Sequence, residues 1–221
     1  MSLDALIVFL KRPRTGEVKT RLVPALGEVA AAALYRVLAE EEIRRTAPSA
    51  GEYRRLFFFA PEEAGADMRA WFPGETWMPQ RGADLGARMA AAFDQAFALG
   101  VRRAAIIGSD VPWVSRELVA CALQSLDEVD LVLGPARDGG YYLLAVSEPR
   151  PQLFQGIAWS TPSVLAHTVE KASALGLSVR LLDTLSDIDT VEDVRREWAR
   201  LRPLVAGDAS LIRVLEPLVA P

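Results

Sequence analysis

Cysteine and histidine are almost missing from this chain of 221 residues, which contains one of each, Cys121 and His167. A single cysteine excludes a disulfide framework and a cysteine-based zinc site. With one cysteine and one histidine, triad and dyad mechanisms built on those groups are poorly supported. The apolar segment around Cys121 predicts a small buried hydrophobe at this position rather than a nucleophile.

Long apolar runs and a broad basic character are also missing. No apolar run reaches the ~18 residues of a membrane-spanning helix, and no signal peptide precedes the first predicted strand. The isoelectric point is near 5.2, whereas a general nucleic-acid binder normally has a basic face. We therefore expect a cytoplasmic protein whose partners are neither membranes nor nucleic acids. The absence of Gly-x-Gly-x-x-Gly after the first strand argues against a dinucleotide-dependent oxidoreductase.

Apolar runs of strand length alternate with helical patterns along most of the chain. Strands are predicted at residues 5–10, 53–60, 76–79, 103–108, 131–135, 141–146 and 178–182. Helices are predicted at 27–46, 62–72, 84–99, 115–126, 191–201 and 209–218. Another follows Thr161-Pro162, with Pro162 near its first position, and runs to 175. Asp84 is the predicted N-cap of the helix at 84–99. The strands are continuously apolar, which is typical of strands covered on both faces. The pattern predicts one domain, 1–221, with a three-layer α/β architecture and a mostly parallel sheet. The tight turn Asp138-Gly139-Gly140 predicts a small antiparallel excursion.

A strongly basic loop follows the first strand. Residues 11–21 hold five cations and one anion, a local charge of +4 in a chain of net charge −4, so the rest carries −8. Pro13 and Gly16 favour a tight turn here. Backbone N–H groups and Lys or Arg side chains that converge in such a loop can hold a phosphate. The alternative is a solvated charged turn.

Acidic residues follow two of the later strands. Asp110 stands directly after the fourth strand and before Pro112, and Asp187 and Asp189 follow the seventh. Mg²⁺ is commonly held by one or two carboxylates together with substrate phosphates, so these acids are candidate metal ligands. The alternative is helix capping, in which Asp189 caps the helix at 191–201. Ligands of such sheets bind beyond the carboxyl ends of the strands, so the acids and the basic loop are expected to face one cleft.

Three further groups follow strands or loops at the same expected edge. Gln80 and Arg88 are candidates for hydrogen bonds to a nucleobase or ribose. The hairpin at Asp138–Gly140 allows a close approach of backbone to a ligand, although it also reads as a simple turn. Tyr141 and Trp159 are candidates for an acceptor pocket, with core packing as the alternative.

Taken together, these segments resemble a known family over residues 6–198. The matching motifs are Lys11-x-Pro13-x-x-Gly16-x-Val18-Lys19-Thr20-Arg21-Leu22, Gly82-x-Asp84-Leu85-Gly86-x-Arg88-Met89, Gly108-Ser109-Asp110-x-Pro112, Gly134-Pro135-Ala136-x-Asp138-Gly139-Gly140-Tyr141-Tyr142, Trp159-Ser160-Thr161 and Asp187-Ile188-Asp189-Thr190. They resemble the bacterial DUF2064 family, whose members are labelled glycosyltransferases or radical-SAM/selenodomain-associated transferases. It belongs to the nucleotide-diphospho-sugar transferase superfamily, alongside guanylyltransferases of molybdenum-cofactor and phospholactate chemistry.

The resemblance implies a GT-A-type, Rossmann-like fold and a metal-dependent transferase with a nucleotide donor and a small acceptor. It implies catalytic roles for Lys19, Arg21 and Asp110, and Mg²⁺ or Mn²⁺ on Asp110 with Asp189 or Asp187. The implied nucleotide-binding residues are Lys11, Gly16, Lys19, Arg21, Gln80, Leu85, Gly86 and Arg88. The implied acceptor-binding residues are Asp138, Gly139, Gly140, Tyr141 and Trp159.

Two departures from the superfamily leave nucleotidyl and glycosyl transfer both open. The first loop has one glycine in place of the Gly-x-Gly-Thr-Arg-Met form, and Ser109-Asp110-Val111 offers one acid in place of Asp-x-Asp. The basic loop and the single acid favour a triphosphate donor, whereas the family label favours glycosyl transfer. The alternative to an enzyme is a regulatory module that binds a nucleotide without turning it over.

Overall fold

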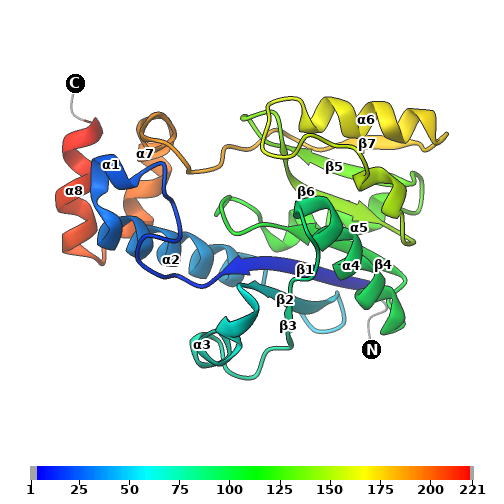
Figure 1. Ribbon diagram of the computed structural model, residues 1–221, viewed down its shortest axis with the longest axis horizontal. Coiled ribbons are helices and arrows are strands. Elements are labelled where there is room, and N and C mark those ends of the chain that lie inside the picture. Colours follow the sequence, from blue (N-terminus) through cyan, green and yellow to red (C-terminus); the bar gives the residue numbers. More distant parts are fainter. Residues whose placement is uncertain (1–3, 220–221) are drawn as a thin grey trace.

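The structure, a computed structural model, describes residues 4–219 and is built on one seven-stranded sheet (Figure 1). The strand order is β3-β2-β1-β4-β6-β5-β7. The strands are β1 (Asp4–Lys11), β2 (Arg54–Ala60), β3 (Trp77–Pro79), β4 (Arg103–Ile107), β5 (Leu131–Pro135), β6 (Tyr141–Val146) and β7 (Val179–Leu181). Only β6 runs antiparallel to its neighbours within this sheet, which confirms the predicted excursion.

Eight α-helices and two short 3₁₀ turns are present in the described part of the chain. They are α1 (Val23–Leu26), α2 (Glu28–Arg45), η1 (Glu62–Ala64), α3 (Gly65–Trp71), α4 (Leu85–Ala98), α5 (Arg116–Ser125), η2 (Pro151–Phe154), α6 (Val164–Ala174), α7 (Val191–Val205) and α8 (Ala209–Val219). Within residues 4–219, none of them has both the length and the apolar character needed to cross a membrane.

Helices cover both faces of the sheet, so the predicted three-layer α/β architecture is confirmed. In β1, Leu6, Val8 and Leu10 point to a core formed with α2, α5, α7 and α8. The alternate residues Ala5, Ile7 and Phe9 point to a second core formed with α4, η2 and α6. Because both faces are apolar, β1 reads as a continuous hydrophobic run, and seven of its eight residues are buried.

Side-chain caps fix the starts of the helices near the carboxyl edge of the sheet. Asp84 Oδ1 accepts the N–H of Ala87 at 2.8 Å, so the predicted cap of α4 is confirmed. Ser115 caps α5 in the same way through Leu118 N–H. Helix α6 begins at Val164, so Pro162 lies before the helix and not at its first position.

The predicted burial of Cys121 is wrong, because this side chain is exposed. Helix α5 turns Val119, Ala122 and Leu123 toward the core. Cys121 falls on the opposite face of the same helix, where an apolar local sequence does not decide the side chain's environment.

Candidate active site

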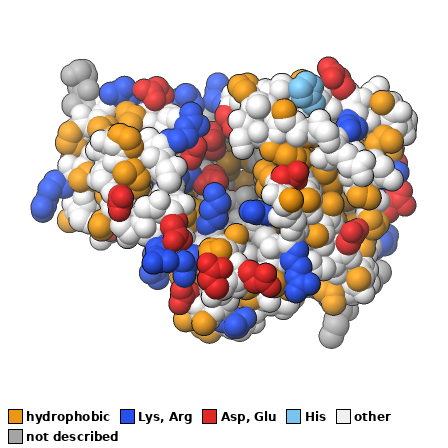
Figure 2. All heavy atoms as spheres, viewed as in Figure 1, with side chains coloured by type: hydrophobic (Ala, Val, Ile, Leu, Met, Phe, Trp, Pro, Cys, Tyr) orange, Lys and Arg blue, Asp and Glu red, His pale blue; other side chains and the backbone are white. Residues whose placement is uncertain are grey.

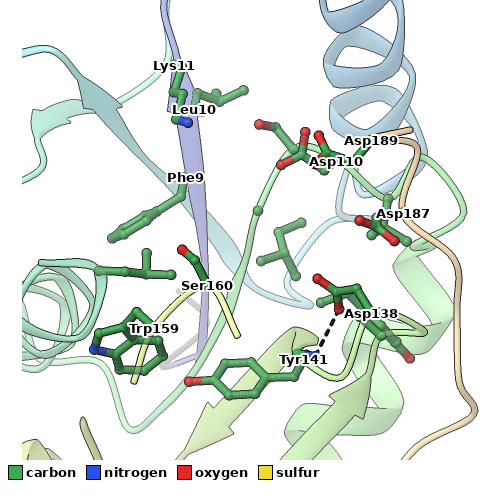
Figure 3. A pocket seen from close by; sticks show the side chains of 18 of the residues that line it. Phe9, Leu10, Lys11, Asp110, Asp138, Tyr141, Trp159, Ser160, Asp187 and Asp189 are labelled. Carbon is green, nitrogen blue, oxygen red and sulfur yellow. Dashed lines mark hydrogen bonds between the residues drawn. The ribbon is translucent and has the colours of Figure 1, made fainter. Parts of the chain in front are cut away.

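A cavity of about 560 Å³ opens at the carboxyl edge of the parallel strands. Ligands of open α/β sheets bind at this edge. Figure 2 shows acidic and basic side chains gathered around the hollow, and Figure 3 shows several of its lining residues from close by. The predicted site residues that line it are Lys11, Lys19, Arg21, Gln80, Leu85, Arg88, Asp110, Asp138, Gly140, Tyr141, Trp159, Asp187 and Asp189. Six separate segments of the sequence therefore meet in one place.

Three predicted residues, all glycines, lie outside this lining. Gly16 has φ +78° and forms the turn of the basic loop beside Glu28. Gly139 has φ +90°, and a Cβ there would collide with the backbone of Pro162. Gly86 lies beneath the indole of Trp159. These glycines allow the turns and close contacts of the segments that line the cavity, but they do not line it themselves.

Lys19 is the innermost charged group of the basic loop. Its side chain is 1% exposed, and Nζ donates to Asp110 Oδ1 and lies 3.6 Å from Asp189 Oδ1. Its backbone has φ +49°, a left-handed conformation that is uncommon for a residue other than glycine. Strained residues of this kind concentrate at functional sites. Ser160, which also lines the cavity, is the other such residue in the described chain, with φ +62°.

Asp110 and Asp189 present their carboxylates to the cavity rather than to helix termini. Ser115 caps α5, which leaves Asp110 available. Thr190 caps α7 in a capping box with Asp193, which leaves Asp189 available. Arg21 contacts the far oxygen of Asp189 at 3.3 Å. The capping alternative is therefore wrong for both acids.

The charges of this cluster stabilise one another. Burial lowers the pKa of Lys19, but the carboxylates of Asp110 and Asp189 more than offset burial, so the pKa lies above its usual value. Partial burial raises the pKa of Asp110, and the Lys19 ammonium more than offsets it, so this pKa lies below the usual range. At neutral pH Lys19 and Asp110 therefore both carry their charges.

Tyr35 on α2 connects the two loops that carry these charges, a role that no sequence pattern indicates. Its hydroxyl accepts the backbone N–H of Lys11 at 2.8 Å and lies 3.0 Å from Ser109 Oγ. The side chain is buried, with 2% of the residue exposed. Its position on the apolar face of a helix resembles any core aromatic, so only the fold reveals its partners.

Asp187 and Asp138 lie together on the opposite side of the cavity from Lys11 (Figure 3). Burial and the neighbouring Asp138 raise the pKa of Asp187 to about 6. Asp138 Oδ1 accepts the N–H of Gly140 at 2.9 Å, which closes the hairpin turn between β5 and β6. The segment 138–140 therefore forms a hairpin turn and, through Asp138 and Gly140, also lines the cavity.

The expected nucleoside-binding residues are fixed by backbone contacts. The amide nitrogen of Gln80 donates to Leu10 O at 3.3 Å and to Phe58 O at 3.1 Å. Arg88 Nε donates to Gly82 O at 3.2 Å. These bonds leave Gln80 Oε1 and the terminal nitrogens of Arg88 as the groups available to a ligand.

The acids at the cavity fit a divalent metal only in partnership with a substrate. Across residues 4–219, no group of three acidic, histidine or cysteine side chains converges closely enough to hold a metal ion alone. Asp110 and Asp189 lie beside each other around Lys19 Nζ, and 52% and 32% of their side chains are exposed. Mg²⁺ commonly takes one or two carboxylates and completes its shell with water and phosphate oxygens, so this donor set fits.

Comparison with known proteins supports a transferase that uses a nucleotide donor. The family model "Uncharacterized protein conserved in bacteria (DUF2064)" matches residues 43–161. A phosphoenolpyruvate guanylyltransferase of Chloroflexus aggregans is 31% identical over 192 residues, which are 84% of this chain and 93% of that protein.

Two solved structures show how far the fold is shared. A Desulfovibrio desulfuricans G20 protein, named for the nucleotide-diphospho-sugar transferases, is 34% identical with a TM-score of 0.88, covering 99% of this chain and 97% of that one. Rv0371c of Mycobacterium tuberculosis, crystallised with manganese, is 15% identical with a TM-score of 0.50, covering 87% and 96%. The GT-A-type fold expected from the resemblance is confirmed. The chain is a member of the DUF2064 family, and it is an enzyme of the nucleotidyltransferase-like kind that uses a nucleotide donor.

Proposed function

We propose that this protein transfers a nucleotidyl group from a nucleoside triphosphate to a small anionic acceptor, with Mg²⁺ or Mn²⁺. One observation carries the proposal: the basic loop and the Asp110–Asp189 pair meet at one end of a 560 Å³ cavity. A cavity of this size suits a nucleotide and a small acceptor. The name of the guanylyltransferase relative supports a guanine nucleotide as donor and a phosphorylated, carboxylated acceptor such as phosphoenolpyruvate.

The proposed reaction needs no protein nucleophile. A phosphate oxygen of the acceptor attacks the α-phosphorus of the donor, and the bond from that phosphorus to the bridging oxygen of the β-phosphate breaks. Pyrophosphate leaves with the electron pair of that bond. Lys11 and the exposed Arg21 neutralise the triphosphate, which lowers the repulsion between the two anionic reactants.

The remaining site residues orient the two substrates. Gln80, Leu85 and Arg88 line the side that we assign to the nucleoside, and Tyr141 and Trp159 line the side that we assign to the acceptor. Asp110 and Asp189 would hold the divalent metal, with Asp187 as the other candidate. When bound, the metal supplies a positive charge against the phosphate oxygens.

A thermal-shift screen of nucleoside triphosphates and nucleotide sugars, with and without Mg²⁺, tests the donor. A ligand that binds only the native state raises the melting temperature, by an amount equivalent to about 2.7 kcal/mol at 100 times its Kd. We expect the largest shift with a triphosphate plus Mg²⁺, and pyrophosphate release once phosphoenolpyruvate is added.

Two outcomes would replace the proposal. A shift confined to nucleotide sugars would indicate glycosyl transfer, which the name of the Desulfovibrio relative favours. A shift that needs no metal, with no product from a panel of phosphorylated and sugar acceptors, would indicate a regulatory nucleotide-binding module.

A further inference from the structure

We propose that Lys19 is a resident counter-ion of the Asp110–Asp189 pair, so that a divalent metal binds tightly only together with the nucleotide. In this proposal Lys19 is a positioning residue and does not contact the donor's phosphates. The inference deepens the proposed function, because it concerns how the same site acquires its metal.

The exposure of the three side chains supports this role. Lys19 is 1% exposed, whereas Asp110 is 52% and Asp189 is 32% exposed. The ammonium therefore lies on the protein side of the carboxylates, and the carboxylates face the cavity. A phosphate that enters the cavity meets Asp110 and Asp189 before it meets Lys19.

The backbone around Lys19 holds the side chain in this inner position. Val18 and Leu22 on either side are 3% and 0% exposed and belong to the apolar core. The carbonyl of Lys19 accepts the N–H of Leu22 at 2.8 Å, and φ is +49°. A turn anchored by two core side chains, in a conformation that suits few residues, is costly to rearrange. Lys19 therefore stays with the carboxylates when ligands arrive.

Arg21 differs from Lys19 in being free to move. Its side chain is 67% exposed, and its contact with Asp189 Oδ2 is 3.3 Å long. In the nucleotide-free protein the two carboxylates are thus balanced by two cations, which leaves little attraction for a divalent metal. A triphosphate draws Arg21 away and brings its own negative charges, so the site becomes net negative when the nucleotide binds.

The test measures Mn²⁺ binding to nucleotide-free protein by electron paramagnetic resonance, which does not depend on catalysis. Removal of a charge near the pair in Lys19→Met should tighten Mn²⁺ binding by about tenfold. Lys19→Arg should keep the wild-type affinity, because it keeps the charge. Arg14→Met in the same loop is the matched control, since Arg14 pairs with Glu17 and is not itself part of the cavity lining. Unchanged or weaker Mn²⁺ binding by Lys19→Met would overturn the proposal.

A second measurement uses the wild-type protein and so does not depend on whether the variant folds. Amine labelling with acetic anhydride, read by mass spectrometry, should leave Lys19 unmodified both with and without a triphosphate in EDTA. If Lys19 instead bound the donor's phosphates, its amine would be labelled in the free protein and protected by the nucleotide. That pattern would contradict the counter-ion role. If Lys19→Met binds Mn²⁺ more tightly but the wild-type protein catalyses no nucleotidyl transfer, the proposed function is refuted and the counter-ion role is not.

Discussion

The indole of Trp159 lies against the backbone of Gly86, so closely that a Cβ on Gly86 would stand 2.5 Å from Cζ2 of the ring. Gly86 is in the first turn of α4, and Trp159 is in the loop that follows η2. The contact joins the segment that we assign to the nucleoside to the segment that we assign to the acceptor. A displacement of Trp159 or of the first turn of α4 would therefore affect both proposed subsites.

Gly86→Ala is expected to displace Trp159 and to weaken binding of both substrates. Overpacking of this kind costs about 1–3 kcal/mol of stability, measurable by chemical denaturation. Gly207→Ala is the control, because a Cβ at Gly207 meets no atom within 4 Å. Wild-type stability and substrate affinity in Gly86→Ala would show that the ring moves without consequence.

Tyr35→Phe removes the hydroxyl that joins Lys11 to Ser109. The loss of a buried partner is expected to cost about 1–3 kcal/mol of unfolding free energy, measured in urea. Tyr53→Phe is the matched control, since the Tyr53 hydroxyl donates one buried bond to Thr46 O, at 2.8 Å, away from the cavity. Both variants should lose stability, but only Tyr35→Phe should also lose nucleotide affinity. Equal affinities in the two variants would contradict a role for Tyr35 in the site.

Arg21→Ala tests whether the basic loop binds phosphate. The loss of a charge-assisted contact should weaken triphosphate binding by about tenfold in calorimetry, equivalent to about 1.4 kcal/mol. Arg14→Ala, in the same loop but outside the cavity lining, should leave the affinity unchanged. An equal loss in both variants would indicate a general electrostatic effect of the loop, and no loss in either would indicate a solvated charged turn.

Asp110→Asn replaces a proposed metal ligand with a side chain of the same shape. We expect kcat to fall by about 100-fold or more, a loss typical of removing charge stabilisation from a transition state. The melting temperature should stay within a few degrees of the wild type. Asp94→Asn, on the exposed face of α4, controls for the loss of one carboxylate. Full metal-dependent activity in Asp110→Asn would remove Asp110 from the mechanism.

Asp187 should make stability depend on pH in the direction opposite to a paired carboxylate. Burial and Asp138 raise its pKa from 3.8 to about 6, so the native state binds a proton that the unfolded state has already lost. Stability therefore falls as the pH rises from about 4 to about 6.

Asp187→Asn removes this penalty. At pH 7.5 it should stabilise the protein by about 1–2 kcal/mol, a value reduced for partial solvent exposure. Near pH 3 the gain should disappear, because the carboxyl of Asp187 is then mostly protonated in both the native and the unfolded state. Asp183→Asn controls for the removal of one charge, because Asp183 is exposed and lies in the same segment after β7. Urea denaturation in EDTA at several pH values gives the comparison, and a gain that does not change with pH would rule out this origin.

Much of the architecture was predictable from the sequence because it depends on local patterns. The continuous apolar run of β1 predicted a strand covered on both faces, and Asp138-Gly139-Gly140 predicted the hairpin that makes β6 antiparallel. The position of Asp84 before an apolar helical pattern predicts the cap of α4, which the Asp84 carboxylate forms with the N–H of Ala87. Ligands of such sheets bind beyond the carboxyl ends of the strands, and this rule predicts that the basic loop and Asp110 share one cavity.

The roles of individual side chains depended on contacts between distant segments. The sequence alone determined that a basic loop and several acids share one edge of a parallel sheet, since strand direction and loop position follow from local periodicity. Only the tertiary structure decided that Lys19 contacts Asp110 and Asp189 from the protein side, and that Cys121 faces solvent. Lys19 and Asp110 are 91 residues apart in the chain, so no local pattern specifies their contact. Burial and pairing arise from packing, and packing is a property of the whole fold.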